Sequence, residues 1–185
     1  MRGGERAHGA LKVLGVDPGT AVTGWGLIER RDGAVVHLRH GTIRLGARTS
    51  LPVKLATIHR ELVSHCAQGR PDVVALEKSF VGRNVQSAFR LGEVRGIVML
   101  VAAQARVGVA EYSPAEVKLA IAGTGRAEKT QVERAIVREL GLTGSVAADA
   151  ADALAVALCH LYSVRMRAVL DAAAPARSGA MEWTA

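Results

Sequence analysis

Apolar and polar residues alternate along the first part of the chain, in short runs that end at turn signals. Such alternation is typical of strands with one face in a core. A Pro18-Gly19 turn follows the first run, and an Asp32-Gly33 turn separates the second from the third. Turns this short join neighbouring antiparallel strands, so the pattern predicts an antiparallel meander. A later run, VVALE, is almost wholly apolar, as strands buried on both faces are. The predicted strands are 12–17, 23–30, 34–45, 73–77 and 107–112.

Between and after these strands, apolar residues recur at the spacing of a buried helix face. In the first such segment they stand at positions 51, 55, 58, 62 and 66, and Pro52 suits a first helical turn. Gly92 and Gly96 lie four residues apart, a spacing that would let another helix or backbone approach closely. The predicted helices are 51–68, 84–106, 114–122, 127–140 and 147–163. This order of elements predicts an α/β protein, a layered sheet that begins with the meander.

The predicted elements fill one domain, residues 12–163, between two predicted flexible tails, 1–11 and 164–185. Of the 185 residues, 49% are apolar and 22% are charged. This balance supports a folded core and excludes disorder as the main state.

The sequence also points to a compartment. Wholly apolar runs reach only seven residues, as in 97–103, far short of the roughly 20 that a spanning helix needs. The start, MRGGERAHGA, lacks the apolar segment of a signal peptide. Cys66 and Cys159 stand at apolar helical positions and not in a CxxC pair. We therefore expect a reduced, cytoplasmic protein with no membrane partner.

The charge balance favours a polyanionic partner. The chain carries 24 Lys and Arg against 17 Asp and Glu, a formal net charge of +7, and 19 of the 24 cations are Arg. The guanidinium fork matches phosphate oxygens, so nucleic acid is the leading partner. A high-GC genome, which enriches Arg, Ala and Gly together, is the competing explanation of this composition.

Four carboxylates stand in apolar surroundings. Asp17 ends the first strand, Glu77 ends VVALE, and Asp149 and Asp152 lie in AADAADALAVAL. A carboxylate at such positions costs several kcal/mol unless it is paired, protonated or bound to a cation. Asp149 and Asp152 are three residues apart, so on a helix they lie on one face and can share a cation.

Oxygen ligands without a His or Cys cluster suit Mg²⁺ or Mn²⁺, and clustered carboxylates that hold two such ions catalyse in-line phosphoryl displacement. Each acid also has a simpler explanation. Asp17 precedes Pro-Gly and could be a turn residue. Glu77 could face solvent, and Asp149 could be a first-turn acid that complements the helix dipole. Asp152 lies deeper among Ala and Leu and is harder to dismiss.

Several contiguous blocks resemble the RuvC Holliday-junction resolvases. These blocks are LGVDPGT at 14–20, VVALE at 73–77 with Phe80 after it, AEKTQV at 127–132 and ADAADALAVAL at 148–158. The resemblance covers nearly all of residues 12–163. It implies a ribonuclease-H-like fold, here a five-stranded mixed sheet with helices on both faces. It also implies a homodimer that nicks two strands of a four-way DNA junction symmetrically with divalent metal, Mg²⁺ or in its place Mn²⁺.

The family's site residues carry over one by one. Its four catalytic acids fall on Asp17, Glu77, Asp149 and Asp152, the same four that the burial argument selects. Its lysines near the active site fall on Lys118 and Lys129, where a cation could contact the scissile phosphate; a solvated helix face is the simpler explanation. The aromatic that enters the junction centre falls on Phe80, and Arg83 occupies a basic position that suits a phosphate contact. Partnership with the branch-migration proteins RuvA and RuvB is implied by the resemblance alone.

The sequence departs from the family pattern in two ways. Its terminal extensions are longer than the shared block requires, and the third acid is Asp where some relatives have His. Three other functions compete. RuvX-type (YqgF) RNA nucleases share the DPGT strand but not the AEK and ADAADAL blocks. Actin-like or sugar-kinase ATPases share a DxGT turn but need a longer chain. A non-catalytic junction-binding protein would not need intact acids.

Overall fold

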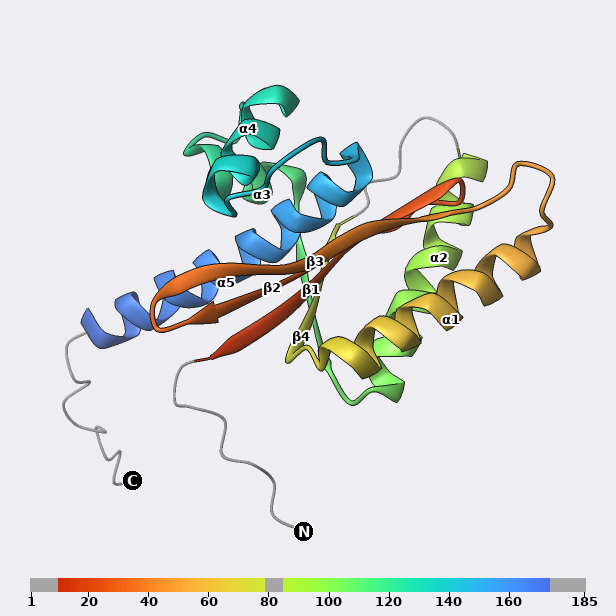
Figure 1. The fold of residues 1–185 in the computed structure, drawn as a ribbon, viewed down its shortest axis with the longest axis horizontal. Helices are drawn as coiled ribbons and strands as arrows, with labels where there is room; N and C mark the ends of the chain where they lie inside the picture. Colours follow the sequence, from red (N-terminus) through yellow and green to blue (C-terminus); the bar gives the residue numbers. More distant parts are fainter. Residues whose placement is uncertain (1–9, 79–84, 174–185) are drawn as a thin grey trace, which may run out of the picture.

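The computed structural model describes residues 10–78 and 85–173. Five strands form one mixed sheet in the order β3-β2-β1-β4-β5 (Figure 1). β1 pairs antiparallel with β2, and β2 with β3, whereas β4 runs parallel to both β1 and β5. The predicted meander and mixed sheet are therefore confirmed. The strands are β1 (Leu11–Asp17), β2 (Val22–Arg31), β3 (Ala34–Arg44), β4 (Val73–Glu77) and β5 (Gly108–Tyr112).

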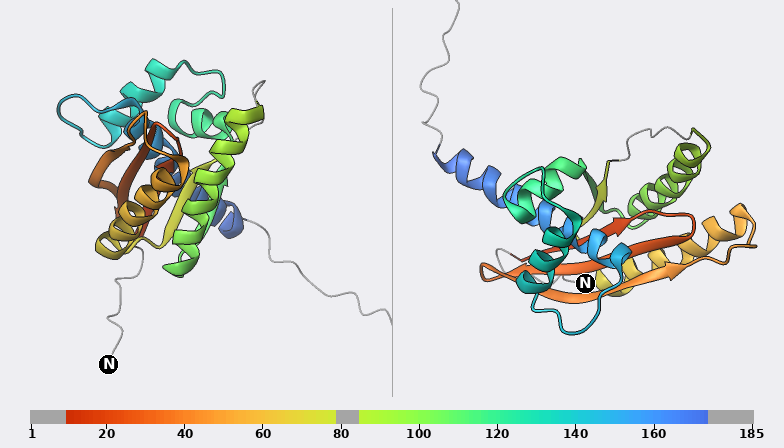
Figure 2. Two further views of the ribbon diagram at one scale, coloured as in Figure 1. Left: turned by 90° about the vertical axis from the view of Figure 1, so that its right-hand side faces the viewer. Right: turned by 90° about the horizontal axis from the view of Figure 1, so that it is seen from above.

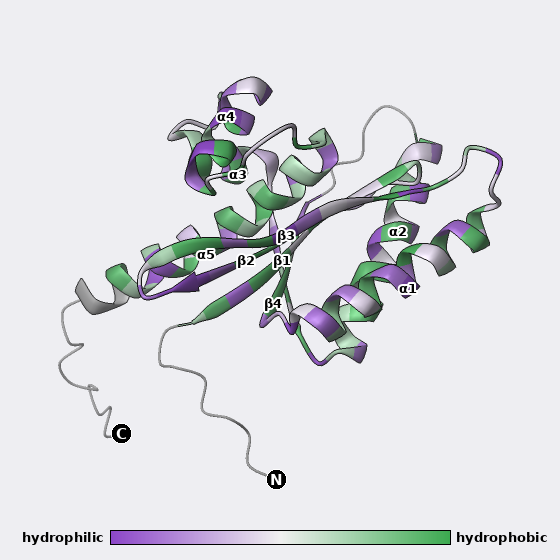
Figure 3. Ribbon diagram, in the orientation of Figure 1, coloured by the Kyte–Doolittle hydropathy of each residue, from purple (hydrophilic) through white to green (hydrophobic). Residues whose placement is uncertain are grey.

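Helices cover both faces of this sheet, as predicted. α1 (Leu51–Gly69) and α2 (Val85–Gln104) lie against one face. α5 (Ala148–Ala173) crosses the other face, and α3 (Pro114–Ala122) and α4 (Lys129–Glu139) pack on α5 (Figures 1 and 2). Figure 3 shows the amphipathic pattern of α1 and the mostly apolar middle of α5.

Strand alternation divides the core in two. Side chains of Leu14, Val16 and Leu76 pack toward α1 and α2, whereas Val13 and Ala75 pack toward α5. Both cysteines are unpaired and buried, one in each core, so the predicted role as small apolar residues is confirmed.

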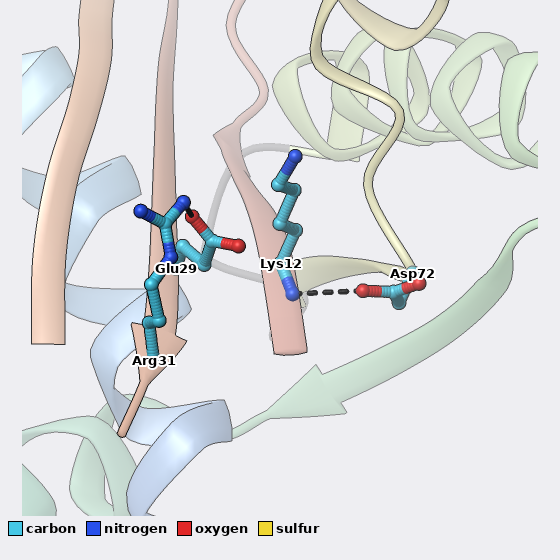
Figure 4. Close-up of polar contacts among 4 residues, drawn as sticks. All are labelled: Lys12, Glu29, Arg31 and Asp72. Carbon is cyan, nitrogen blue, oxygen red and sulfur yellow. Dashed lines mark hydrogen bonds and ion pairs between the residues drawn. The ribbon is translucent and has the colours of Figure 1, made fainter. Parts of the chain in front are cut away.

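Polar contacts fix the base of the sheet (Figure 4). The backbone N–H of Lys12 donates to Asp72 Oδ2 at 2.8 Å, and the backbone N–H of Asp72 donates to the Lys12 carbonyl at 2.9 Å. These two bonds tie the starts of the parallel strands β1 and β4. On β2, the buried Glu29 carboxylate pairs with Arg31 at 2.5 Å, which satisfies a charge that burial alone would disfavour.

The last helix is longer than predicted. α5 continues to Ala173, so the predicted end at 163 is wrong, and the predicted tail 164–185 begins ten residues too early. Residues 164–173 are mostly Ala, Arg, Leu and Met, which favour helix, and the next proline along the chain is Pro175. At the other end, β1 starts at Leu11, inside the predicted 1–11 tail. Residues 1–9 and 174–185 lie outside the described residues.

The fourth helix is shorter than predicted. It begins at Lys129 and not at 127, because Glu128 is still extended (φ −74°, ψ 154°) and its backbone N–H donates to the side chain of Gln131 at 2.9 Å. This bond satisfies one of the amide groups that a helix start leaves open. Val132 and Ile136 are buried, and Leu140 follows them into the same core, as predicted.

By length and hydropathy alone, Ala148–Leu170 would pass as a membrane-spanning helix. Half of this segment is buried inside the protein, because α5 lies across the sheet as its central core helix. Its apolar character is therefore explained by packing.

Candidate active site

The four acids come from three elements that meet at one edge of the sheet. Asp17 is the last residue of β1 and Glu77 is the last residue of β4. The two strands are parallel neighbours, so their carboxyl ends lie side by side. Asp149 and Asp152 lie in the first two turns of α5, whose start passes over this edge (Figure 1). The structure thus brings together acids that are up to 135 residues apart in sequence.

Glycines in β1 and β2 let α5 lie close to the sheet. A Cβ on Gly24 would come within 1.9 Å of the Asp149 carbonyl oxygen, and one on Gly15 within 1.9 Å of the Ala153 carbonyl oxygen. A Cβ on Gly26, which pairs with Gly15, would come within 2.5 Å of the Leu154 side chain and 3.4 Å of its Cα. Only glycine leaves room for the helix backbone here, so we call Gly15, Gly24 and Gly26 the glycine seat.

Sequence reasoning missed the glycine seat. Its signal was present, because glycine is unfavourable inside strands and often marks a close backbone approach. Gly24 and Gly26 alternate in TGWG, which places them on one face of a strand. Gly24 also pairs directly with Asp17, so the seat sets the height of Asp149 and Asp152 above that carboxylate.

The site concentrates negative charge in a half-buried place. Burial raises the pKa of Asp17 to about 7, and the neighbouring charges of Asp152, Glu77 and Asp149 add to the rise. Burial and then Asp152 also raise the pKa of Glu77. Asp17 and Glu77 are thus both partly buried beside other acids of the cluster. Asp17 is within electrostatic reach of the other three acids, which is the condition for sharing a cation around it.

The two lysines lie at the rim of this cluster. Lys129, the first residue of α4, donates from Nζ to Asp152 Oδ2 at 2.8 Å, and this bond raises the lysine's pKa. Its side chain is 58% exposed and thus accessible to an incoming phosphate. Lys118, partly buried on α3, is close enough for its charge to lower the pKa of Glu77. Both predicted lysines therefore lie near the acids.

The donor chemistry fits a hard divalent cation. Carboxylate oxygens are the ligands that Mg²⁺ and Mn²⁺ prefer. A cation would offset the burial and, after it, the mutual repulsion that raise the pKa of Asp17. Within residues 10–78 and 85–173, no group of three or more acidic, His or Cys side chains forms a ready-made ligand set. The fit therefore rests on the type of donor and on the shared charge, with Asp152 engaged by Lys129.

Two predicted site residues, Phe80 and Arg83, lie outside the described residues. In sequence they stand between Glu77, at the end of β4, and Val85, at the start of α2. Their roles stay predictions.

Comparison with known proteins identifies relatives along most of the chain. The family model described as crossover junction endodeoxyribonuclease RuvC matches residues 13–160. The RuvC protein of Syntrophomonas wolfei is 44% identical over 165 residues, which cover 89% of this chain and 96% of that protein. The RuvC protein of Halorhodospira halophila is 47% identical over 152 residues, which cover 82% and 90%.

Solved structures agree with the sequence matches. Thermus thermophilus RuvC superimposes with a TM-score of 0.77 at 30% identity, covering 85% of this chain and 97% of that one. The same protein in complex with a Holliday junction substrate gives a TM-score of 0.77 at 28% identity, covering 84% and 96%. The yeast mitochondrial Holliday junction resolvase Ydc2, at 13% identity and a TM-score of 0.63, covers 87% and 82% and shares the fold.

Proposed function

The chain belongs to the RuvC family of crossover junction endodeoxyribonucleases, and on that premise we propose that its four-acid site resolves four-way DNA junctions. It is a structure-selective endonuclease with a ribonuclease-H-like fold. The observation that carries the residue assignment is the shared charge of Asp17, Glu77, Asp149 and Asp152 at the carboxyl edge of β1 and β4.

The four carboxylates are assigned as ligands of divalent metal, with Asp17 at the centre because the other three all act on its charge. The enzyme is metal-dependent, as its family is, and the all-oxygen donor set favours two Mg²⁺ per site, with Mn²⁺ able to replace them. Bound metal supplies activation of water and stabilisation of charge on the phosphate. The expected products are 5′-phosphate and 3′-hydroxyl ends.

The lysines are assigned to the phosphate. Lys129 places an accessible ammonium beside the acids, and a cation fixed there stabilises the negative charge that grows on the phosphate during the displacement. Lys118 lies on α3, where its charge lowers the pKa of Glu77 after burial and Asp152 have raised it. It is assigned to the same phosphate. Phe80 is assigned to stacking at the junction centre and Arg83 to a phosphate contact; both assignments rest on family resemblance.

A homodimer would explain symmetric cutting, because two sites related by a two-fold axis meet two equivalent strands. One face of α2 supports this proposal. Exposed apolar residues and two glycines, Gly92 and Gly96, recur there at helical spacing. Among the described residues outside the helix's own backbone, nothing lies within 4 Å of a Cβ built on either glycine. We call this face the α2 stripe: Val85, Phe89, Gly92, Gly96, Met99 and Leu100. The opposite face packs in the core through Val94, Val98 and Val101.

RuvA and RuvB are proposed as partners by family resemblance, and the cytoplasm as the compartment. The alternatives lose ground to the family match: the RuvC model spans residues 13–160, which an RNA nuclease of the RuvX type or an ATPase would not explain, and all four acids are present.

The test is cleavage of an end-labelled synthetic four-way junction beside a matched linear duplex, with Mg²⁺, Mn²⁺ or EDTA, on a denaturing gel. We expect paired nicks confined to the junction and abolished by EDTA. Tight junction binding without metal-dependent nicking would instead support a non-catalytic junction-binding protein. Cutting of RNA instead would support the RuvX-type alternative.

A further inference from the structure

Arg95 reaches from α2 to the end of the strand that carries Glu77. Its Nη1 donates to the backbone carbonyl oxygen of Glu77 at 2.5 Å, and its Nη2 pairs with the carboxylate of Glu111 on β5. The Arg95 side chain is only 14% exposed. A single guanidinium therefore links α2, β4 and β5 at the edge of the sheet where the acids meet.

The register of the strands places this contact behind the Glu77 side chain. Leu76 packs toward α1 and α2, so the next residue, Glu77, points to the opposite face, toward α5. Glu111 pairs with Leu76 and therefore faces the α2 side, as Arg95 requires, while Tyr112 pairs with Glu77 and packs in the α5-side core. Arg95 thus holds the peptide from one side of the sheet while the carboxylate is presented on the other.

Within residues 10–78 and 85–173, few other bonds hold the end of β4. Its ladder with β5 ends at Glu77, and one further bond follows, from the Lys78 N–H to the Tyr112 carbonyl at 2.6 Å. β1 pairs with β4 only as far as Leu76. The Glu77 carbonyl is thus fixed by a side chain, and a charged donor holds a carbonyl more firmly than a neutral one does.

We propose that Arg95 is a positioning residue for Glu77: its bond to the Glu77 carbonyl, oriented by Glu111, keeps that carboxylate directed at Asp17. The inference rests on the proposed function, since it assumes that Glu77 helps to hold the metal. Groups that orient metal ligands contribute strongly to metal affinity even though they never touch the metal. Arg95 itself contacts neither metal nor DNA in this assignment.

Three variants separate the parts of this contact. Arg95→Gln removes the positive charge and the guanidinium group that makes both contacts. Arg95→Lys keeps the charge as a compact ammonium that cannot reproduce the two-pronged contact. Glu111→Gln leaves an amide oxygen for Arg95 and leaves the carbonyl bond in place. Arg60→Gln is the matched control, because Arg60 is 69% exposed on α1 and, among the described residues, forms an ion pair only with its neighbour Glu61.

Three readouts are needed: Mn²⁺ affinity of the DNA-free protein by isothermal titration calorimetry, junction affinity in EDTA, and the single-turnover cleavage rate as a function of Mg²⁺. For Arg95→Gln we expect Mn²⁺ affinity to fall by about tenfold and the half-saturating Mg²⁺ to rise in step. Junction affinity in EDTA should stay within about twofold of the wild type. The Mn²⁺ affinity of Arg95→Lys should lie between those of the wild type and Arg95→Gln. Glu111→Gln should lose less Mn²⁺ affinity than Arg95→Gln, and Arg60→Gln should lose none.

The inference is overturned if Arg95→Gln lowers the melting temperature yet keeps the wild-type Mn²⁺ affinity and Mg²⁺ dependence, because Arg95 would then only support the scaffold. Should Arg95→Gln fail to fold, Arg95→Lys and Glu111→Gln decide by the same readouts. If the wild type does not cut junctions at all, the proposed function fails instead. If the wild type cuts junctions but no variant changes the Mn²⁺ affinity or the Mg²⁺ dependence of cleavage, this inference fails and the proposed function stands.

Discussion

The two faces of the sheet are packed by different rules. Toward α1 and α2, branched apolar side chains such as Val16 and Leu76 fill the space against Ile58 and Leu62. Toward α5, glycines replace side chains along part of the same strands, and the helix backbone comes close to the sheet. The first face gains stability from buried apolar area. The second also has an apolar core, but along the glycine seat it gives up side-chain packing and gathers like charges, so that part of the face is organised for chemistry.

The largest effect should come from the charge at the centre of the α5 face. Asp17→Asn should reduce single-turnover junction cleavage about a thousandfold, about 4 kcal/mol in activation free energy, because the amide is a poor substitute for a shared carboxylate ligand. Junction affinity should stay close to wild type. Gel-based cleavage and binding assays in parallel check both, and a variant that nicks at the wild-type rate would contradict the metal assignment.

The glycine seat should be nearly as sensitive. Gly24→Ala forces a Cβ onto the Asp149 carbonyl, so α5 must shift. We expect a loss of about 3 kcal/mol in the free energy of unfolding together with loss of cleavage. Gly108→Ala on β5 is the control, since no atom of the described residues beyond its chain neighbours lies within 4 Å of the new Cβ there. Urea denaturation of both variants gives the comparison, and equal stabilities would refute the close fit.

On the other face, the same size of stability loss should leave the chemistry intact. Leu62→Ala empties a site that is 1% exposed and should lower the free energy of unfolding by about 3 kcal/mol. Its single-turnover cleavage rate, measured well below the melting temperature, should remain within about twofold of wild type. A loss of cleavage in parallel with stability would mean that the two faces are not separable.

The pH dependence of stability should mark the α5 face in metal-free protein. Because the pKa of Asp17 is raised to about 7 from 3.8, the folded state keeps a proton that the unfolded state has already lost. Stability from this group is therefore lost as pH rises from about 4 to about 7 and stays low above that. Asp17→Asn lacks this loss.

In EDTA, the variant's gain in unfolding free energy over wild type should grow from near zero at pH 4 to about 4 kcal/mol at pH 8. Thermal unfolding across this range measures it, and added Mg²⁺ should narrow the gap by stabilising the wild type. A gap that is the same at pH 4 and pH 8 would contradict the raised pKa.

The smallest effect on cleavage should come from Lys129, at the rim of the acid cluster. Lys129→Ala should slow cleavage about tenfold, or about 1.4 kcal/mol, because an exposed cation contributes less than a buried ligand. Lys54→Ala, which removes a charge from α1 on the other face, serves as the control. If both lysine variants cut at the same rate, Lys129 is a solvated helix residue and not a phosphate contact.

Local pattern predicted the elements well where the signal was strong. The strand ends at Asp17 and Glu77 and the helix Pro114–Ala122 agree with the prediction to the residue. Predicted and observed helix boundaries differ in two kinds of place. α4 begins later than predicted because a single contact, from the Glu128 N–H to the Gln131 side chain, sets its start. α5 ends later than predicted because no helix-breaking residue follows position 163 within the helix. The four acids were found because a carboxylate among apolar residues is anomalous in sequence alone.

What the sequence by itself determined is which residues are chemically out of place and which strands and helices carry them, since both follow from local composition and periodicity. What only the tertiary structure decided is how those residues meet. The glycine seat, the overlap of charges at Asp17 and the link from Arg95 to the Glu77 carbonyl all join positions far apart in the chain. Such contacts depend on strand order, register and helix approach, and these are set by the packing of the whole domain.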